Sequence, residues 1–590
     1  MIRTAALPGL FAPVLALLAA CGVIGDPSLP SGDVRDKLTV ADLTAELPRI
    51  VGPVNNVYFV PIGKPGPARH DFSGVLMFPE TDMDSSANPF VLIKRPRLSV
   101  FPKFKAAFFR HGEHLVPWRR DIIRVRGRES NWDIILQPGR VWSEPTDGDW
   151  SRASFPFVLA DRFLNDAYNG VATFLFNGTE VSQLAFQVTQ ETAYAAGTFD
   201  FSGRIPVTFK PGQVRDRDAL ATSFDAELAD QMELRPFVNL VRAFPSGELI
   251  QLNSQYDPLT ISTSAILVGG ELYGWPCAGR YGIYPYCREM RHGVYSITKT
   301  LGAAVTLFRL AAKYGDEVMD EMIKDHVPIQ ASHSGWDAVT FRDVLNMATG
   351  VGDAAPERLP LNPTADEQQS KSVPFYLTHS SSAKLDVAFS YGNYAWGPGE
   401  VFRYNTVQTF VLAVAMDAYL KKKEGPEAEL WDMVQNEVLR PIGVHHAPLR
   451  HTREIGGSPG IPVFGFGYYP TLEDTAKIAR LLQNRGRHAG EQILSAALVR
   501  EALQRDGHKG LPTAGRNTAG DQWRYHMSMY VRPWRPKDDC LVPLPYSSGR
   551  GGSQIAFLPN KVTVFRFTDA EIYDNWTLFT AGDAVRPVCP

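Results

Sequence analysis

Ser296-Ile297-Thr298-Lys299 opens a strongly apolar run of helical spacing and decides how the second half of the chain is interpreted. Nucleophilic catalysis by a serine needs a neighbouring group that can take the hydroxyl proton. Residues three apart on a helix share one face, with Cβ atoms about 5–6 Å apart, so Lys299 is expected beside Ser296. The positive end of the helix dipole favours an oxyanion and weakens proton binding by the lysine. These features predict a nucleophilic serine at the start of a buried helix over 296–313.

A second copy of the same spacing, Ser381-Ser382-Ala383-Lys384, lies in a polar, serine-rich stretch with no apolar run after it, and we expect a loop there. Residues 456–460, GGSPG, match the G-x-S-x-G pattern of a nucleophile elbow. That elbow needs a strand, a turn and a helix, whereas here Pro459 follows Ser458 in a Gly- and Pro-rich stretch. Ser296 is therefore the preferred nucleophile.

Two histidine groups invite a metal interpretation. They are His111-Gly112-Glu113-His114 and the set His445, His446 and His451. Neither has the H-E-x-x-H spacing that places two ligands on one helical face. We expect no metal and no cofactor.

Four further segments follow Ser296 in order: 336–350 (WDAVTFRDVLNMATG), 397–406 (GPGEVFRYNT), 440–444 (RPIGV) and 548–559 (SGRGGSQIAFLP). With the S-x-x-K motif, they make residues from about 250 to 590 resemble the serine β-lactamase and penicillin-binding-protein superfamily. The resemblance is strongest to its class C branch, which includes esterases, D-aminopeptidases and 6-aminohexanoate-dimer hydrolases. It implies an α+β catalytic domain with an antiparallel sheet flanked by helices. The pattern of apolar residues changes after residue 215, which sets the bounds of this domain at 216–590. Strand-like runs at 249–272 and at 523–531, 553–558 and 562–568, with helical spacing between them, predict one sheet assembled from both ends of the domain.

The resemblance also implies roles for individual residues. Ser296 would be the acylated nucleophile, and Lys299 and Tyr404 would form the proton-transfer pair, with either the amine or the phenolate as general base. The backbone N–H groups of Ser296 and Arg550 would form the oxyanion hole. Substrate-binding candidates are Asn405, Ser548, Gly549 and Arg550. Arg550 could recognise an anionic substrate, but a solvated surface side chain is the more ordinary interpretation.

Two departures from the family pattern bear on the substrate. Thr406 stands where the family has an Asn, so the amide that contacts β-lactams is missing or shifted to Asn405. Ser547 stands in place of the Lys of Lys-Thr-Gly, which removes the cation that holds a β-lactam carboxylate. We therefore expect an esterase or amidase acting on a small or oligomeric substrate. A binding lipoprotein with an inactive hydrolase domain, and a D,D-peptidase or β-lactamase, remain as alternatives.

The first residues have the features of an export signal. Arg3 precedes a broken apolar stretch, and Leu18-Ala19-Ala20-Cys21 resembles a bacterial lipobox, in which Cys21 carries the lipid. We expect a signal peptide over 1–20, a tether over 21–35 and attachment to the cell envelope. Gly22, in place of the Asp that retains lipoproteins at the inner membrane, favours the outer membrane.

Residues 36–215 alternate short apolar runs with Gly, Pro, Asn and Asp, which is typical of a β-sandwich or barrel. Expected strands are 56–62, 74–78, 90–93, 122–125, 132–136, 172–176 and 204–209. Trp118, Trp132, Trp142 and Trp150 gather in this half. They could form a polymer-binding face, but core and rim packing is the more ordinary interpretation.

The composition sets broader limits. The 590 residues are too many for one ordinary core, and the net charge of −3 gives no basic footprint for nucleic acid. Four cysteines follow Cys21, and export would place them in an oxidising compartment where they form disulfides. Of the three possible connectivities we favour Cys277–Cys287 with Cys540–Cys589. A metal site is the rival, but the chain has no C-x-x-C.

Overall fold

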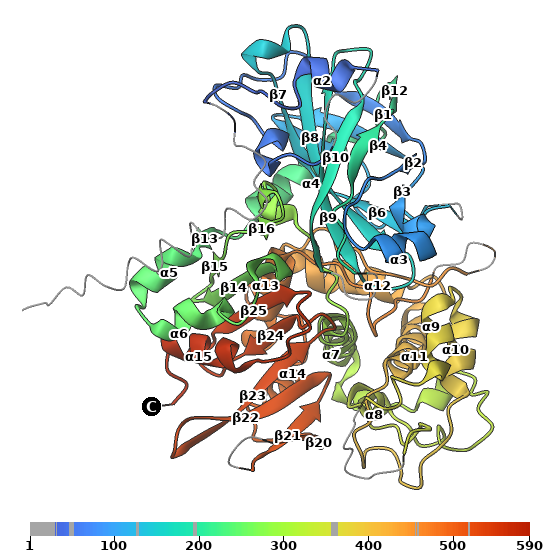
Figure 1. The fold of residues 1–590 in the computed structure, drawn as a ribbon. Helices are drawn as coiled ribbons and strands as arrows, with labels where there is room; N and C mark the ends of the chain where they lie inside the picture. The colour runs from blue at the N-terminus through green and yellow to red at the C-terminus, as the bar shows by residue number, and fades with distance from the viewer. Residues whose placement is uncertain are drawn as a thin grey trace, which may run out of the picture.

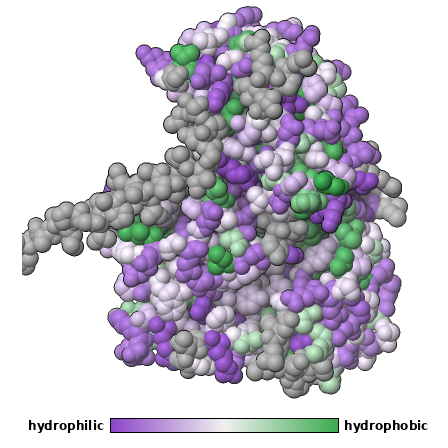
Figure 2. All heavy atoms as spheres, viewed as in Figure 1, coloured by the Kyte–Doolittle hydropathy of each residue, from purple (hydrophilic) through white to green (hydrophobic). Residues whose placement is uncertain are grey.

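The computed structural model describes residues 30, 32–46, 52–125, 129–192, 197–355, 364–454, 456, 460–516 and 520–589. The signal peptide, Cys21 and Ser458 lie outside these residues, as does most of the tether. Within the described ranges, no helix is both long enough and apolar enough to cross a membrane. Figure 2 shows polar side chains over most of the visible face, with small, separate apolar groups among them.

The first half forms one antiparallel ten-stranded sheet, in the order β11-β10-β9-β8-β7-β5-β4-β1-β12, with β6 paired to β8. Its strands are β1 (Ser73–Phe78), β4 (Phe104–His111), β5 (His114–Pro117), β6 (Trp132–Leu136), β7 (Gly139–Trp142), β8 (Ser151–Asp161), β9 (Ala167–Phe176), β10 (Leu184–Thr192), β11 (Ser202–Ile205) and β12 (Thr208–Pro211). Only Pro206 and Val207 separate the two edge strands, so the sheet curls until its edges meet around a phenylalanine-rich core. We call this unit the barrel domain; it occupies the upper part of Figure 1.

The tryptophans of the barrel domain divide between core and surface. Trp132 and Trp142 are buried, whereas Trp118 is 42% exposed. Trp132 donates its indole N–H to Leu98 O at 2.7 Å, which fixes it as a core residue. The tryptophans therefore do not form one binding face.

Two of the strands expected in this half are helical instead. Residues 90–93 belong to α3 (Pro89–Lys94), and 56–62 contain the 3₁₀ helix η1 (Asn56–Phe59). A short apolar run cannot by itself distinguish strand from helix, and here Pro89 at the start of α3 and the Asn55 cap of η1 decide for helix. Residues 122–125 form only an isolated bridge, Ile123 to Ile134.

The second sheet has nine strands in the order β13-β15-β14-β25-β24-β23-β22-β21-β20. They are β13 (Leu234–Pro236), β14 (Ile261–Val268), β15 (Glu271–Gly274), β20 (Leu511–Arg516), β21 (Gln522–His526), β22 (Met529–Lys537), β23 (Cys540–Ser548), β24 (Gln554–Phe557) and β25 (Thr563–Thr568). β14 pairs with β25, so both ends of this unit, the second domain, build one sheet, as the sequence predicts.

Helices cover both faces of the second sheet because its strands alternate their side chains. Ala265 and Leu267 pack into a large helical core, while Ile266 and Val268 face the opposite side. The first face is covered by helices that include α7 (Val305–Tyr314), α8 (Phe341–Leu345), α11 (Thr406–Glu424), α12 (Leu430–Val434), α13 (Leu472–Gln483) and α14 (Ala496–Ala502). The other is covered by α5 (Phe237–Ala243), α6 (Gly247–Ile250) and α15 (Trp576–Val585).

The expectation of a loop at the second S-x-x-K copy is wrong. Residues Ser381–Phe389 form helix α10, in which the Ser380 hydroxyl accepts a hydrogen bond from Ala383 N as the N-cap. The Lys384 ammonium is buried against the Phe375 carbonyl and ring, which explains how a polar sequence forms a packed helix. Similarly, the apolar residues of 249–260, expected to begin a strand, form α6 and two short 3₁₀ turns.

Both favoured disulfides are present, Cys277–Cys287 and Cys540–Cys589. The first holds a loop of the second domain that packs against the barrel domain, where Tyr284 donates to Gly170 O and Tyr286 to Ser154 Oγ. The second joins the start of β23 to the residues after α15.

Candidate active site

Ser296 lies where an extended segment meets a buried helix. The backbone of Tyr295 has φ +45°, in the left-handed region, and the six residues Lys299–Ala304 form a π-helical stretch, η7, that continues into α7. π-Helical turns are rare in proteins, and those that occur often lie at functional sites. Within the described part of the chain, no acceptor is hydrogen-bonded to Ser296 N–H.

Lys299 is buried and is held by three oxygens. Its Nζ lies 2.9 Å from Ser296 Oγ, 3.0 Å from Thr406 Oγ1 and 2.7 Å from Gly465 O. Burial lowers the pKa of Lys299 to about 7, and the nearby Glu367 carboxylate opposes that shift. A large fraction of the amine is therefore neutral near neutral pH.

Tyr404 approaches Ser296 from the other side. Its hydroxyl donates to Ser296 Oγ at 2.5 Å, and Lys299 Nζ lies 4.9 Å from the centre of its ring. Burial raises the pKa of Tyr404 well above its ordinary value, with further contributions from Tyr525 and Glu367. The phenol therefore stays protonated where Lys299 titrates. The structure brings together all three residues that the sequence predicts.

Asn405, a substrate-binding candidate from the sequence, has a structural role at the start of α11. It is fully buried, and its Oδ1 accepts a hydrogen bond from Val407 N as the N-cap of α11. The helix start needs this acceptor because its first N–H groups have no partner within the helix. Thr406, one residue on, directs its hydroxyl to Lys299.

Glu367 belongs to the site, and the sequence offered no signal for it. Its Oε2 accepts from Thr406 N at 2.6 Å, its Oε1 accepts from the Tyr376 hydroxyl, and it raises the pKa of Lys299. A carboxylate at the N-terminus of α11 is stabilised by the helix dipole. Glu367 thus sets both the start of the helix and the local charge.

The expected oxyanion strand lies against the nucleophile. A Cβ at Gly549 would be 2.3 Å from Val294 O, so only glycine allows this close approach. Ser548 ends β23 and pairs with Gln554 of β24, and Arg550 follows in an exposed turn. Ser547, in the place of the family lysine, is buried and donates to Thr300 Oγ1 at 2.7 Å.

The model of the Beta-lactamase family matches residues 264–565, half of the chain. The chain belongs to the beta-lactamase family. Its second domain has the β-lactamase/transpeptidase-like fold of serine hydrolases, while the barrel domain precedes the matched residues. The comparison with curated proteins found no match to this chain.

Solved structures similar to this beta-lactamase-family chain share little sequence with it. A penicillin-binding-protein homologue from Caulobacter crescentus is 14% identical, with 60% of this chain and 98% of that chain covered and a TM-score of 0.40. A family VIII carboxylesterase is 14% identical over 61% and 99%, with a TM-score of 0.40. A D-stereospecific amidohydrolase from Streptomyces is 12% identical over 55% and 94%, with a TM-score of 0.38.

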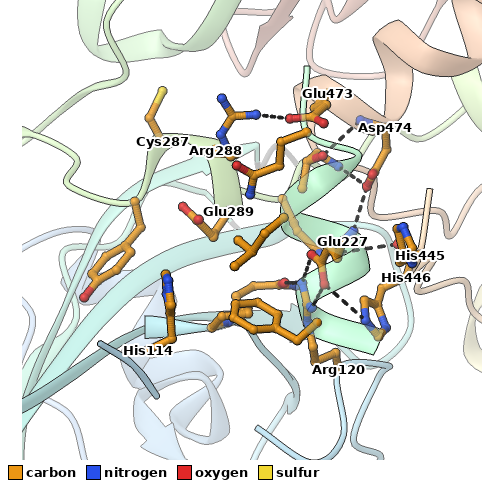
Figure 3. Close-up of a pocket in the computed structure, with 18 of the residues that line it drawn as sticks. His114, Arg120, Glu227, Cys287, Arg288, Glu289, His445, His446, Glu473 and Asp474 are labelled. Carbon is orange, nitrogen blue, oxygen red and sulfur yellow. Dashed lines mark hydrogen bonds and ion pairs between the residues drawn. The ribbon is translucent and has the colours of Figure 1, made fainter. Parts of the chain in front are cut away.

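A separate cavity of about 410 Å³ lies where the barrel domain meets the second domain of this beta-lactamase-family protein (Figure 3). Three ion pairs line it: Arg120 with Glu227, Arg288 with Glu473, and Arg291 with Asp474. Arg120 holds the pKa of Glu227 at about 2 against the effect of its burial. Ser296, Lys299 and Tyr404 do not line this cavity, which is a charged junction between domains.

The predicted histidine groups do not gather metal ligands. His111 is hydrogen-bonded to Asp225, and His445 to Asp230. Across the described ranges, no cluster of His, Cys, Asp and Glu could hold a metal ion.

Proposed function

We propose that this protein hydrolyses an ester or amide through an acyl-enzyme on Ser296. The observation that carries the proposal is that Lys299 Nζ and Tyr404 OH both lie within hydrogen-bond distance of Ser296 Oγ, while burial brings the pKa of Lys299 to about 7. A base whose pKa lies near the working pH is the most effective proton acceptor.

Lys299 is the general base in this proposal. A neutral amine has two N–H groups, which donate to Gly465 O and Thr406 Oγ1, and its lone pair then faces Ser296 Oγ. Lys299 takes the serine proton as Oγ attacks the substrate carbonyl carbon. The resulting oxyanion accepts hydrogen bonds from Ser296 N–H and Arg550 N–H, and each such donor is worth about 2.7–4 kcal/mol in the transition state.

Tyr404 supplies a proton to the leaving group as the bond from the carbonyl carbon breaks. The Lys299 ammonium then restores the phenol, so the enzyme keeps its proton count. Water attacks the acyl-enzyme by the same route in reverse, giving the carboxylic acid and free Ser296. The raised pKa of Tyr404 keeps its phenol protonated in the free enzyme, so the first proton acceptor is Lys299 and not a resting phenolate.

An ester or amide is favoured over a β-lactam by Ser547. The hydroxyl at this position is buried and donates to Thr300, so it offers no cation to a β-lactam carboxylate. Turnover of nitrocefin at ordinary enzyme rates would favour the β-lactamase or D,D-peptidase alternative instead.

We also propose that the mature protein is exported and anchored to the cell envelope by lipid on Cys21, on the strength of the Leu-Ala-Ala-Cys pattern. Metabolic labelling with a fatty acid tests this. Label lost in Cys21→Ala, with release of the protein into the soluble fraction, is the expected result. Equal fractionation of both forms would contradict it.

The test of the hydrolase is the reaction of the purified soluble form with a fluorophosphonate, followed by intact mass and peptide mapping. We expect one adduct, on Ser296, that is absent in Ser296→Ala and in Lys299→Met, which keeps the buried volume but removes the base. A folded protein that forms no adduct would favour a binding lipoprotein with an inactive hydrolase domain. An adduct on Ser458 would identify a different nucleophile.

A further inference from the structure

The five residues before Ser296, 291–295, form an extended segment between the two domains, which we call the nucleophile segment. The backbone N–H groups of Arg291, Gly293 and Tyr295 all donate to side chains of the barrel domain. His292, between them, turns to the second domain, where its ring stacks on Phe567 and its backbone N–H donates to Pro470 O. The segment is therefore held from both sides.

Three buried side chains of the barrel domain make these contacts. Thr192 Oγ1 accepts from Gly293 N and Asn165 Oδ1 from Tyr295 N, both at 2.6 Å. Asn169 accepts from Arg291 N at 3.1 Å and donates to Arg291 O at 2.9 Å. All three side chains are at most 3% exposed, so water cannot replace the bonds they make.

The backbone that these bonds hold is strained and closely packed. A left-handed tyrosine costs of order 1–3 kcal/mol and persists only where the surroundings impose it. At Gly293 an added Cβ would be 1.7 Å from Asn165 O, so the barrel domain touches the segment backbone directly. The strain falls on Tyr295, immediately before the serine whose Oγ must face Lys299.

Asn165 also joins the two parts of the site. Its Nδ2 donates to Tyr468 O at 3.2 Å, and Tyr468 N donates to Thr298 Oγ1 at 3.3 Å. The loop that contains Tyr468 also contains Gly465, whose carbonyl accepts from Lys299. The side-chain amide of Asn165 in the barrel domain is thus bonded both to the nucleophile segment and to the loop that holds Lys299.

We infer that the barrel domain positions the nucleophile, with Thr192 and Asn165 as positioning residues that hold Ser296 Oγ against Lys299. The inference rests on the proposed function of Ser296 and gives the barrel domain a part in the reaction. Neither side chain contacts the reacting atoms; each acts through the backbone of the nucleophile segment. A misplacement of about 1 Å in such an arrangement can cost about a hundredfold in rate.

The experiment compares Thr192→Val, which keeps the shape but loses the acceptor, with Thr192→Ser, which keeps the hydroxyl. The matched control is Thr189→Val on the same strand. Thr189 is equally buried and accepts from Asn56 Nδ2 at 3.1 Å, away from the nucleophile segment. The three variants and the wild type are compared in fluorophosphonate labelling rate, kcat and KM for a p-nitrophenyl ester, melting temperature and hydrogen exchange of the 291–299 peptide.

We expect Thr192→Val to label about tenfold more slowly or worse, to lose kcat with little change in KM, and to exchange faster in 291–299. Thr192→Ser should remain within about twofold of the wild type, and Thr189→Val should lower the melting temperature without slowing labelling. Labelling of Thr192→Val at the wild-type rate, or equal slowing in Thr189→Val, would overturn the inference. If the wild type fails to label, the proposed function is contradicted. Hydrogen exchange of 291–299 still tests the inference in that case: an unchanged exchange rate in Thr192→Val would show that Thr192 does not hold the nucleophile segment.

Discussion

Lys299 shows how the environment of one residue sets its chemistry. An exposed lysine is almost fully protonated at neutral pH and cannot accept a proton from serine. Burial at the start of η7 disfavours the charged ammonium and lowers the pKa of Lys299. The nearby negative charge of Glu367 favours the ammonium and raises this pKa again in part. Two opposing effects therefore leave the pKa of Lys299 near the pH at which a base is useful.

The labelling rate of Ser296 should follow the neutral fraction of Lys299. Below pH 7 the rate should fall about tenfold per pH unit, because only the unprotonated amine can take the proton. No second fall should occur below about pH 9, since the pKa of Tyr404 is raised well above its ordinary value. Fluorophosphonate labelling from pH 5 to pH 9 measures both limbs; a rate independent of pH would exclude Lys299 as the base.

Glu367→Gln should move the acid limb to lower pH. The glutamine can still accept from Thr406 N, but the lost negative charge no longer stabilises the Lys299 ammonium. The variant should therefore label faster than the wild type at pH 6 and similarly at pH 8. Glu454→Gln is the control, since Glu454 bonds to Ser381 of α10 instead. A midpoint that shifts upward would contradict this assignment.

At the scale of elements, the site forms where β23 ends beside the nucleophile segment and α11 begins beside Lys299. Each element contributes through one close approach: Gly549 against Val294 O, and Thr406 at the first turn of α11. Capping by Asn405 and Glu367 fixes the start of α11 and hence the position of Tyr404, two residues earlier. Small changes at these junctions should affect rate more than stability.

Gly549→Ala tests the junction at β23. Its Cβ would meet Val294 O at 2.3 Å, so the strand end must move away and the Arg550 N–H with it. We expect labelling of Ser296 to slow by about 10²–10³, the cost of one oxyanion donor. Gly178→Ala, where nothing lies within 4 Å of the added Cβ, is the control. Equal rates in the two variants would show that the turn after β23 plays no part.

At the scale of the whole molecule, buried polar contacts join the barrel domain to the second domain. Arg280 donates to both oxygens of Glu191 at 2.7 Å, and Arg450 donates to Leu164 O at 2.8 Å. Glu191 is 1% exposed, so its carboxylate depends on Arg280 for compensation. These contacts make the two domains one structural unit.

Arg280→Met should destabilise the protein by about 3–5 kcal/mol, because it leaves the Glu191 carboxylate buried without its cationic partner. Adding Glu191→Gln should recover part of the loss. Urea unfolding followed by tryptophan fluorescence measures both. The exposed pair Arg215–Asp216 provides the control: Arg215→Met should change stability by less than about 0.5 kcal/mol. If Arg280→Met were as stable to urea as the wild type, the Arg280–Glu191 contact would contribute little to the free energy of unfolding.

Much of the second domain could be predicted from local sequence. Its sheet built from both ends, its main helices and the three residues at the site follow from hydrophobic period and ordered motifs, which act over a few residues at a time. The helix α10 and the N-cap role of Asn405 could not, because both depend on what packs around them: Lys384 against Phe375, and Asn405 at the start of α11.

The sequence by itself determined the fold class and indicated Ser296, Lys299 and Tyr404 as the candidate site, because short motifs in a fixed order along the chain carry both. Only the tertiary structure decided which oxygens hold Lys299, how Glu367 tunes it and which residues of the barrel domain hold the segment before Ser296. Asn165 and Tyr295 are 130 residues apart, and Lys299 and Gly465 are 166 apart. Contacts over such separations arise from the packing of whole domains, and no local pattern specifies them.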